Sequence, residues 1–524
     1  MLSLHVLLLS ALPLSWATPP LPPPHITLTV SPSHTYQTIS GFGFCEAFQR
    51  AHALSNLPEP FQTDVLNLLF NRTTGAGFSI LRIGLGSSPD SRGDHMNSPQ
   101  PRADSPFSWD GIDSGQVWVA RQAAARYGVQ TFMADAWSAP GYMKTNGRDD
   151  QGGWLCGVRG EGQATTNTTC AGVSWVQAYA EYLAKYVKAW RDAGIPIGSV
   201  GFLNEPNLIK GYATMQSNGY QAADVAFALT VALQGLGLAA EEVGISCCEG
   251  QGWSYARDLL AELQDAGGEG TLSIYTTHTY KGTPPTPDKP LNTTLPVWVT
   301  EISPIMDRLG LTQTWYHNHS ENEGLLTAIN IHEALTTGNV SAYIYWIGVG
   351  QSRAEAPFIW TPSLQNRTQG NMWGPYDNQT AIEVPPGTIP YTIGSTYWAP
   401  AHFSRFIRPG AKRIGIEATK TSSGNGNGNA TAAILASAYR NVGDDGSIVV
   451  QIINNGDGQA TIFVPTSSLS VSGKASSVCL LETWVTDGNK RFEKVGYVRT
   501  LETNRTADLI VGARSLTTLV FVCS

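Results

Sequence analysis

Short apolar runs alternate with amphipathic segments over residues 41–395. Helical periodicity covers residues 60–70, 175–192, 221–236, 255–264 and 324–337. The apolar runs are residues 41–44, 79–83, 131–134, 200–203, 243–246, 272–276, 297–300 and 342–345. Strands that alternate with helices form a parallel sheet, and eight of them predict a (β/α)8 barrel. The Pro-rich stretch 282–290 predicts no helix at the sixth crossover.

The pattern changes from about residue 396. Short alternating runs follow, separated by Gly- and Asn-rich turns, at residues 411–419, 432–439, 447–453, 460–464, 478–485, 496–500 and 515–522. This pattern is typical of an all-β sandwich, which we predict over residues 396–524. Residues 25–30 also alternate, and we expect segment 25–40 to add a strand to the sandwich. The β domain would then be built from both ends of the chain.

The first residues have the features of a secretory signal. Residues 1–17 contain an apolar run and end in small residues, although they lack Lys and Arg, and a Pro-rich leader follows over residues 18–24. We therefore expect a secreted, extracellular protein. Sequons of the Asn-x-Ser/Thr type agree with this location and lie at Asn71, Asn167, Asn292, Asn318, Asn339, Asn366, Asn378, Asn429 and Asn504.

The charge balance excludes two classes of partner. The chain has 33 Lys+Arg against 41 Asp+Glu, a formal charge of −8, and no basic cluster or tail. Nucleic acids and anionic membrane surfaces require such clusters, so we expect neither as a partner. The 15 Trp and 19 Tyr suit stacking on sugar rings. We expect a monomer that acts on a polysaccharide.

The seven cysteines suggest two disulfides and an unpaired remainder. Cys156 with Cys170 and Cys479 with Cys523 are the expected pairs. Cys45, Cys247 and Cys248 lie in predicted strands or at their ends, and at least one of them must stay unpaired or pair between chains. No Cys-x-x-Cys occurs and the ten His show no ligand spacing, so we expect no metal and no cofactor.

Two of the apolar runs end in a glutamate. Residues 199–203 lead into Asn204, Glu205 and a proline, and residues 295–300 lead into Glu301. In a parallel barrel both carboxylates would lie at the C-terminal face, where such barrels carry their chemistry. Either glutamate alone could be a surface residue in a turn. Together they form the minimal pair for cleaving a glycosidic bond.

Other polar and aromatic residues also follow predicted strands. Arg82 ends the second strand, and a buried Arg beside Glu301 would neutralise its charge and hold the pKa of Glu301 low. A purely structural ion pair is the alternative for Arg82, and core filling is the alternative for Trp137 and Trp346. Asp135 is expected to be a cap or a supporting group. The remaining candidates at strand ends are Asn204, His278 and Tyr280.

This arrangement resembles the retaining clan of (β/α)8 glycosidases. The motifs Ile39-Ser-Gly-Phe-Gly-Phe44, Leu203-Asn-Glu-Pro206, Val299-Thr-Glu-Ile302 and His402-Phe-Ser-Arg-Phe-Ile-Arg-Pro-Gly410 resemble glycoside hydrolase family 30. The resemblance spans nearly the whole mature chain, including the β domain. Within the family, Gly43-Phe-Cys-Glu-Ala-Phe-Gln-Arg50 is most similar to the fungal xylanase-type subfamily, which holds glucuronoxylanases and xylobiohydrolase-like enzymes.

The resemblance implies a mechanism and a substrate. Glu205 would be the general acid/base, Glu301 the nucleophile, and Asn204 a partner of the sugar 2-hydroxyl. Arg50 would bind a glucuronate carboxylate, because a planar guanidinium does so in a bidentate way. The long loop 84–106 would close the non-reducing end of the groove through Asn97, which would allow release of xylobiose. The substrate-binding set is then Arg50, Asn97, Trp137, Asn204, His278, Tyr280 and Trp346, with Arg82 supporting the nucleophile.

The expected function is a secreted retaining β-1,4-xylanase that acts on glucuronoxylan. A β-1,6-galactanase, β-1,6-glucanase or glucosylceramidase of the same family is an alternative with the same fold, because function depends on the site and not on the fold. A non-catalytic polysaccharide-binding protein is an alternative of another class. A pure binder has no need for both Glu205 and Glu301, which argues against that alternative.

Overall fold

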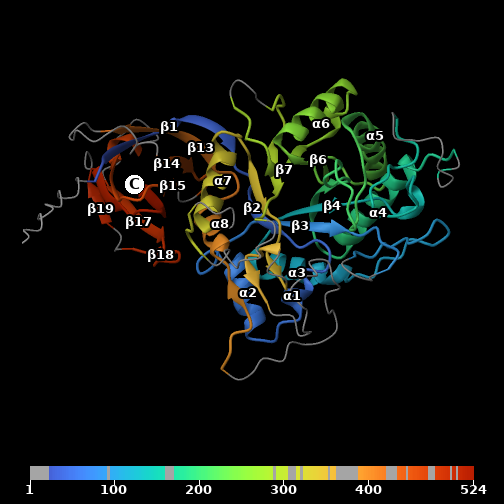
Figure 1. The fold of residues 1–524 in the computed structure, drawn as a ribbon, viewed down its shortest axis with the longest axis horizontal. Helices are drawn as coiled ribbons and strands as arrows, with labels where there is room; N and C mark the ends of the chain where they lie inside the picture. The colour runs from blue at the N-terminus through green and yellow to red at the C-terminus, as the bar shows by residue number, and fades with distance from the viewer. Residues whose placement is uncertain are drawn as a thin grey trace, which may run out of the picture.

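The chain folds into a closed parallel barrel with a curled ten-stranded sheet beside it (Figure 1). The computed structural model describes residues 23–90, 95–159, 170, 172–286, 291–304, 314–318, 323–351, 355–361, 387–420, 433–443, 446–469, 478–495, 499–502 and 506–523. The barrel strands are β2 (Gly41–Cys45), β3 (Ile80–Leu85), β4 (Thr131–Ala136), β5 (Ile197–Gly201), β6 (Gly244–Gly252), β7 (Ile274–Lys281), β8 (Val297–Glu301) and β9 (Ala342–Tyr345). Each predicted apolar run contributes to one of these strands, so the predicted (β/α)8 barrel is confirmed.

Helices cover the outside of the barrel. They are α1 (His52–Ser55), α2 (Phe61–Phe70), α3 (Gln116–Tyr127), α4 (Val176–Asp192), α5 (Gly219–Gly235), α6 (Trp253–Asp265) and α7 (Gly324–Thr336). The five predicted helices match α2, α4, α5, α6 and α7. Helix α3 was not predicted; of its apolar side chains only Val117, Val119, Ala120 and Ala123 are buried, so its apolar face is short. Between β7 and β8 the described residues contain no helix, as expected.

The barrel interior changes from apolar to polar along its axis. Ile80, Met133 and Trp298 form part of an apolar cluster inside the barrel, together with residues of β9. Side chains two residues apart on a strand share a face, so Arg82 follows Ile80 into the interior and Asp135 follows Met133. Both are fully buried. At the C-terminal ends of the strands, the charged side chains of Arg82 and Asp135 therefore lie next to this apolar cluster.

The second unit is a sheet made from both ends of the chain. Its strands are β1 (His25–Thr38), β13 (Lys412–Lys420), β14 (Ile434–Arg440), β15 (Ile448–Asn454), β16 (Ala460–Pro465), β17 (Val478–Thr486), β18 (Glu493–Lys494), β19 (Arg499–Glu502), β20 (Thr506–Val511) and β21 (Ser515–Cys523). Strand β1 pairs antiparallel with β13 and parallel with β16, which confirms that the N-terminal segment joins this unit. Ile26, Leu28 and Val30 of β1 face a core shared with Ile452 and Leu519. The sheet thus curls around one apolar core.

A helix and a buried polar network join the two units. Helix α8 (Trp398–Ser404) lies with α7 between the barrel and the sheet (Figure 1). His402 is fully buried, and its two ring nitrogens lie 2.6 Å from Thr518 Oγ1 and 2.8 Å from Thr486 Oγ1. Gln451 donates to the carbonyl of His402 at 2.7 Å. This helix falls in the segment predicted as all-β, and it braces the sheet against the barrel.

A small three-stranded sheet follows the barrel. Its strands are β10 (Val349–Gly350), β11 (Ile359–Trp360) and β12 (Thr392–Ile393). The predicted signal peptide 1–17, leader residues 18–22, strand residues 496–498, and the sequons at Asn167, Asn366, Asn378, Asn429 and Asn504 lie outside the described residues. The helices that the structure describes are each too short or too polar to cross a lipid bilayer.

The disulfides agree with the cysteine prediction and add one bond to it. Cys156 and Cys170 are joined, as predicted. Cys479 is disulfide-bonded, and the residue opposite it in the register of β17 and β21 is Cys523. Cys247 and Cys248 are joined to each other, a pairing that was not predicted. Cys45 is the buried free cysteine, so the expectation that one of the central three stays unpaired is confirmed.

Candidate active site

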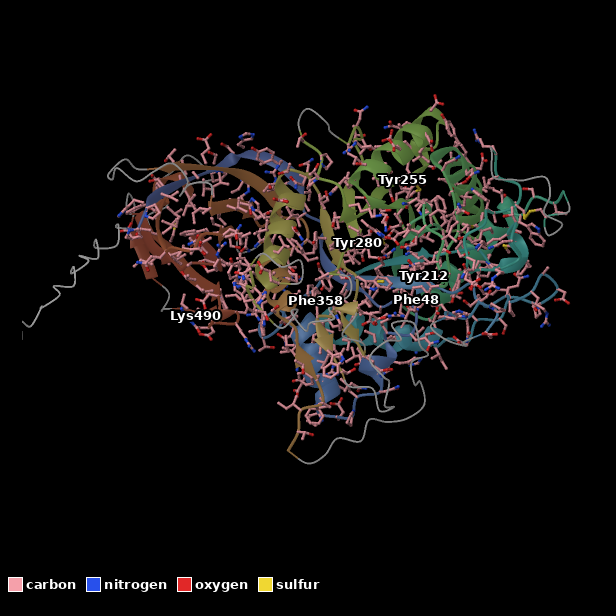
Figure 2. All side chains as sticks on the ribbon, in the orientation of Figure 1. Phe48, Tyr212, Tyr255, Tyr280, Phe358 and Lys490 are labelled. Carbon is pink, nitrogen blue, oxygen red and sulfur yellow. A yellow bond between two sulfur atoms is a disulfide. The ribbon has the colours of Figure 1, made fainter. Side chains whose placement is uncertain are left out.

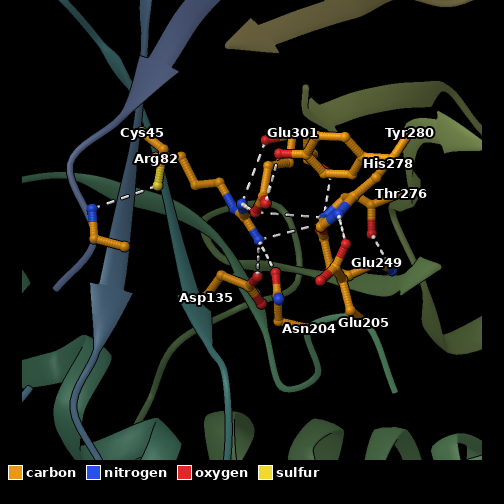
Figure 3. A network of polar contacts seen from close by, with 12 residues as sticks. Cys45, Arg82, Asp135, Asn204, Glu205, Glu249, Thr276, His278, Tyr280 and Glu301 are labelled. Atoms are coloured by element: carbon orange, nitrogen blue, oxygen red, sulfur yellow. Dashed lines mark hydrogen bonds and ion pairs between the residues drawn. The ribbon is translucent and has the colours of Figure 1, made fainter. Parts of the chain in front are cut away.

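Polar side chains converge at the C-terminal ends of the barrel strands (Figure 3). Among the labelled aromatic side chains, Phe48 and Tyr212 lie beside each other with ring centres 6.0 Å apart, whereas Tyr255 lies on the outer helix α6 (Figure 2). The converging groups are Arg82 from β3, Asp135 from β4, Asn204 and Glu205 after β5, Glu249 from β6, His278 and Tyr280 from β7, and Glu301 at the end of β8.

Arg82 lies at the centre of this network. Its Nη1 donates to Glu301 Oε2 at 2.6 Å, and its Nη2 donates to Asp135 Oδ2 at 2.6 Å and to Asn204 Oδ1 at 2.8 Å. The guanidinium carbon lies 4.4 Å from the centre of the Trp137 ring. The predicted contact between Arg82 and Glu301 is therefore present, and Trp137 makes a cation–π contact with the guanidinium.

A glycine makes room for one partner of Arg82. Gly201 is the last residue of β5, and a Cβ atom built there would lie 2.1 Å from Asp135 Oδ1. No side chain can occupy that space while Asp135 keeps its position. The glycine that precedes Phe202 in the sequence is thus explained by the packing of a carboxylate from the neighbouring strand.

Glu205 leaves β5 through an uncommon backbone conformation. Its φ is 45°, a left-handed value that costs a non-glycine residue free energy. The Glu205 amide donates to the carbonyl of Glu249 at 2.9 Å, which helps to hold this conformation. On the side chain, Oε1 lies 3.2 Å from His278 Nδ1, and Tyr212 donates its hydroxyl to Oε2 at 3.4 Å.

Glu301 and Glu205 face each other across a short gap. One carboxylate oxygen of each, together with a ring nitrogen of His278, all lie within 4.8 Å of one another. Oε1 of Glu301 accepts a hydrogen bond from the Tyr280 hydroxyl at 3.0 Å. Inverting glycosidases need about 6.5–9.5 Å between carboxyl groups, whereas retaining enzymes need about 5–5.5 Å. The observed spacing suits the retaining chemistry.

Burial and neighbouring charges shift the pKa values in opposite directions. Burial raises the pKa of Glu301, and the positive charges of His278 and Arg82 only partly oppose it. The expectation that Arg82 beside Glu301 would hold the pKa of Glu301 low is therefore not met. Burial would also raise the pKa of Glu249, but Arg82 and His278 outweigh it and lower that pKa to about 2. Burial opposes the charged form of His278, yet Glu301, Glu205 and Glu249 raise its pKa to about 10.

The sequence did not single out Glu249 or Tyr212. Glu249 is 1% exposed and contacts both Arg82 and His278. The predicted fifth strand ended at residue 246, whereas β6 continues to Gly252 and includes the two joined cysteines. Extending that strand would have placed Glu249 among the strand-end acids. Tyr212 lies in the loop after β5, where a lone Tyr carries no sequence signal.

The remaining predicted residues lie around this network. His278 has no exposed surface. Its ring nitrogens lie 3.2 Å from Glu205 and 2.8 Å from Glu249, and Nε2 also lies 3.7 Å from Glu301, so the side chain acts on a substrate only through these carboxylates. Trp346 packs with Trp137 and Phe48 at ring-centre distances of 5.9 and 6.3 Å. These two Trp residues belong to an apolar cluster at the barrel mouth.

Arg50 is buried and already paired. It is 1% exposed and forms an ion pair with Glu355, whose side chain is equally buried. Its guanidinium carbon lies 5.3 Å from the Phe48 ring and 5.9 Å from the Trp346 ring. A substrate carboxylate that reaches Arg50 would therefore have to join or displace Glu355. The role predicted for Arg50 stays a prediction.

The loop that contains Asn97 is attached to the barrel mouth through Met96. Met96 packs in the same apolar cluster as Phe48 and Trp137, while Asn97 is exposed. Asn97 also lines a cavity of about 350 Å³ together with Asp90, Trp109 and others. The role of Asn97 at one end of a substrate groove stays a prediction.

The carboxylate pair and His278 are near enough to share a metal ion, but the charges around them do not favour one. An Arg82 nitrogen lies 2.6 Å from Glu301 and supplies a fixed positive charge at that point. Each carboxylate also accepts a hydrogen bond from a tyrosine. We therefore identify no metal ligands in this network.

Comparison with known proteins agrees with this geometry. Residues 25–268 match the model of O-glycosyl hydrolase family 30. The catalytic domain of the family 30 xylanase C from Talaromyces cellulolyticus is 35% identical, with a TM-score of 0.72 over 94% of this chain and 99% of that chain.

Two further relatives differ in the activity that their names give. An endo-1,6-β-D-glucanase from Aspergillus fumigatus is 28% identical over 207 residues, which are 38% of this chain and 42% of the relative. The lysosomal acid glucosylceramidase of Mus musculus is 26% identical over 193 residues, 36% of this chain and 35% of the relative. The match thus spans about two fifths or less of each relative.

Proposed function

Because this chain belongs to glycoside hydrolase family 30, we propose that it is a secreted, retaining β-1,4-xylanase that cleaves glucuronoxylan by double displacement. The observation that carries the proposal is the pair of oxygens from Glu205 and Glu301 within 4.8 Å of each other at the barrel mouth. The named activity of the Talaromyces cellulolyticus relative, which aligns over 94% of this chain, supports xylan as the substrate.

In the first step Glu301 is the nucleophile and Glu205 the acid. A Glu301 oxygen forms a bond to the anomeric carbon as the glycosidic bond breaks, and Glu205 transfers its proton to the leaving oxygen. Arg82 and Tyr280 donate to Glu301 at 2.6 and 3.0 Å, which orients the attacking carboxylate. Arg82 also donates a hydrogen bond to the side-chain oxygen Oδ1 of Asn204. The side-chain NH2 of Asn204 is therefore the group that donates to the sugar 2-hydroxyl.

In the second step Glu205 is the base. It removes a proton from water, the water oxygen bonds to the anomeric carbon, and the bond to Glu301 breaks. Each carboxylate returns to its starting state. Because both displacements invert the anomeric carbon, the product keeps the β configuration.

The substituent preference rests on Arg50. A planar guanidinium suits bidentate binding of a uronic carboxylate, which would join or displace Glu355 at Arg50. If Asn97 limits the groove, the enzyme also releases xylobiose from non-reducing ends. A β-1,6-glucanase is the second candidate, because the Aspergillus fumigatus relative bears that name.

Product analysis separates these candidates. The wild type, Arg50→Ala and Glu301→Gln are incubated with glucuronoxylan, linear xylo-oligosaccharides, β-1,6-glucan and β-1,6-galactan. We expect the wild type to release oligosaccharides with glucuronate at one fixed position, and Arg50→Ala to lose this pattern while it still cuts linear chains. Hydrolysis of a β-1,6-linked polymer alone would overturn the xylan proposal. Unchanged behaviour of Glu301→Gln would instead indicate a binding protein.

A further inference from the structure

Glu249 is a buried carboxylate that no step of the proposed reaction uses. Its Oε2 lies 2.8 Å from His278 Nε2 and 3.3 Å from Arg82 Nη2, and it accepts the Thr300 hydroxyl at 2.5 Å. The side chain is 1% exposed. Its φ of 55° turns the chain within β6 toward these partners. A residue so deeply enclosed cannot touch a polysaccharide, so any effect on the reaction must act through a neighbour.

The neighbour that reaches the reacting groups is His278. One ring nitrogen faces Glu249, and the other, Nδ1, lies 3.2 Å from Oε1 of Glu205. Glu249 also holds the backbone of Glu205, whose amide donates to the Glu249 carbonyl at 2.9 Å. The three side chains form a continuous line, carboxylate–imidazole–carboxylate, which runs from the enclosed interior to the acid/base (Figure 3).

Resting on the proposed function, we propose that Glu249 is a positioning residue that acts through His278: it fixes the imidazole tautomer and keeps one proton on the Glu205–His278 pair. An anionic Glu249 can only accept a hydrogen bond, so Nε2 of His278 must carry a hydrogen. In the neutral imidazole, Nδ1 is then the basic nitrogen, and it faces Glu205. Nδ1 can therefore accept the proton of Glu205 or share it.

The proton balance of the reaction fits this arrangement. Before the first step the pair holds one exchangeable proton, either on Glu205 or on His278 Nδ1. Transfer to the leaving oxygen leaves the pair with none, and the water that attacks in the second step returns one. Glu249 neither gains nor loses a proton, and its negative charge favours the protonated pair throughout.

The surrounding charges agree with a proton held at this point. The low pKa of Glu249, about 2, keeps it anionic, and the pKa of His278 is raised to about 10. The charged groups that act on His278 are Glu205 after β5, Glu249 on β6 and Glu301 on β8, which raise its pKa, and Asp135 on β4 also interacts with it. The Tyr280 ring of β7 lies against the imidazole at a centroid distance of 5.8 Å. Arg82 on β3 contacts Glu249 and Glu301, and Tyr212 donates to Glu205.

Glu249→Gln tests the proposal by removing the charge and keeping the shape. The pH profile of kcat/KM is measured on the saccharide that the wild type cleaves. We expect the basic limb to move to lower pH by about 1–3 units, the shift that one opposite charge at this distance causes. We also expect kcat/KM to fall at least about tenfold more on that saccharide than on its 2,4-dinitrophenyl glycoside, whose leaving group needs no acid.

Asp135→Asn is the matched control. This substitution replaces another buried carboxylate that contacts Arg82 with a neutral amide. Among the described residues, Asp135 makes no hydrogen bond to His278. We expect its basic limb to move less than that of Glu249→Gln. Equal shifts in the two variants, or equal losses on both substrates, would show that Glu249 only neutralises Arg82 and would overturn the proposal.

A measurement without turnover separates this proposal from the proposed function. In the wild type labelled with ¹⁵N-histidine, the signals of His278 are assigned by their loss in His278→Gln. We expect Nε2 to be protonated at every pH at which the protein is folded, and Nδ1 to titrate. A neutral ring protonated on Nδ1 would overturn the proposal whatever saccharide the enzyme cleaves. If no saccharide is cleaved but the expected tautomer is found, the proposed function fails and the assignment of the Glu249–His278 contact stands.

Discussion

Nη1 of Arg82 lies 2.6 Å from Oε2 of Glu301, with the guanidinium fully enclosed by the barrel. The same group holds Asp135 at 2.6 Å through its other terminal nitrogen. One planar cation therefore fixes two carboxylates from different strands. A single ammonium could not reach both along the same directions.

We expect Arg82→Lys to fold but to lose most of its activity. Lys keeps the positive charge that the buried carboxylates need, whereas Arg82→Ala would leave them uncompensated. Losing one of the two contacts that Arg82 makes with buried carboxylates costs about 2–5 kcal/mol. The value of kcat/KM should therefore fall by about 30-fold or more. Steady-state kinetics and thermal unfolding, measured together, check this. A Lys variant with wild-type kinetics would show that the fork geometry is unimportant.

Glu205→Ala should reveal both the acid role and the stereochemistry. We expect kcat on the natural polymer to fall by about 10²–10⁴-fold, the usual contribution of a general acid. Hydrolysis of a 2,4-dinitrophenyl glycoside should still form the covalent intermediate, and added azide should rescue turnover because a small anion fits the vacated space. The azide product, identified by NMR, should have the β configuration. An α product would contradict double displacement.

The barrel and its carboxylate pair could be predicted because their signals are local. Each apolar run ends where its strand reaches the mouth, so Glu205 and Glu301 had to share one face once eight parallel strands were assumed. The addition of β1 to the β domain was predictable for a similar reason, since Ile26, Leu28 and Val30 alternate with polar residues, whereas its pairing with β13 was not predicted.

The rest of the site depends on contacts that no local pattern encodes. Glu249 lies beyond the apolar part of β6, after two cysteines that the sequence did not pair with each other. The burial of Arg50 against Glu355 joins residues 305 positions apart. The role of Gly201 becomes visible only when Asp135 is placed beside it.

Gly201→Ala should destabilise the fold through a single methyl group. The added Cβ would lie 2.1 Å from Asp135 Oδ1, so the carboxylate or the strand must move. Overpacking of this kind costs about 1–3 kcal/mol, and we expect a lower Tm together with reduced activity because Asp135 holds Arg82. Gly198→Ala is the matched control, since its Cβ on the same strand meets only the Phe132 carbonyl at 4.0 Å. Equal Tm values for the two variants would contradict this account.

Acid should weaken the junction between barrel and sheet through His402. Burial, with help from the nearby charge of Arg405, holds the pKa of His402 well below its usual value of about 6.5. Below pH 6.5 the unfolded chain binds a proton at this position that the folded chain does not, so stability decreases as the pH falls. The expected slope is about 1.4 kcal/mol per pH unit for one proton.

His402→Gln tests this dependence, because glutamine keeps a donor and an acceptor near Thr486 and Thr518 but cannot titrate. We expect it to be less stable than the wild type at pH 7, yet to lose less stability between pH 6.5 and 5. Urea unfolding at several pH values measures both quantities. His34→Gln, which changes an exposed histidine of β1, is the control and should keep the wild-type slope. A wild-type slope in His402→Gln would place the acid sensitivity elsewhere in the chain.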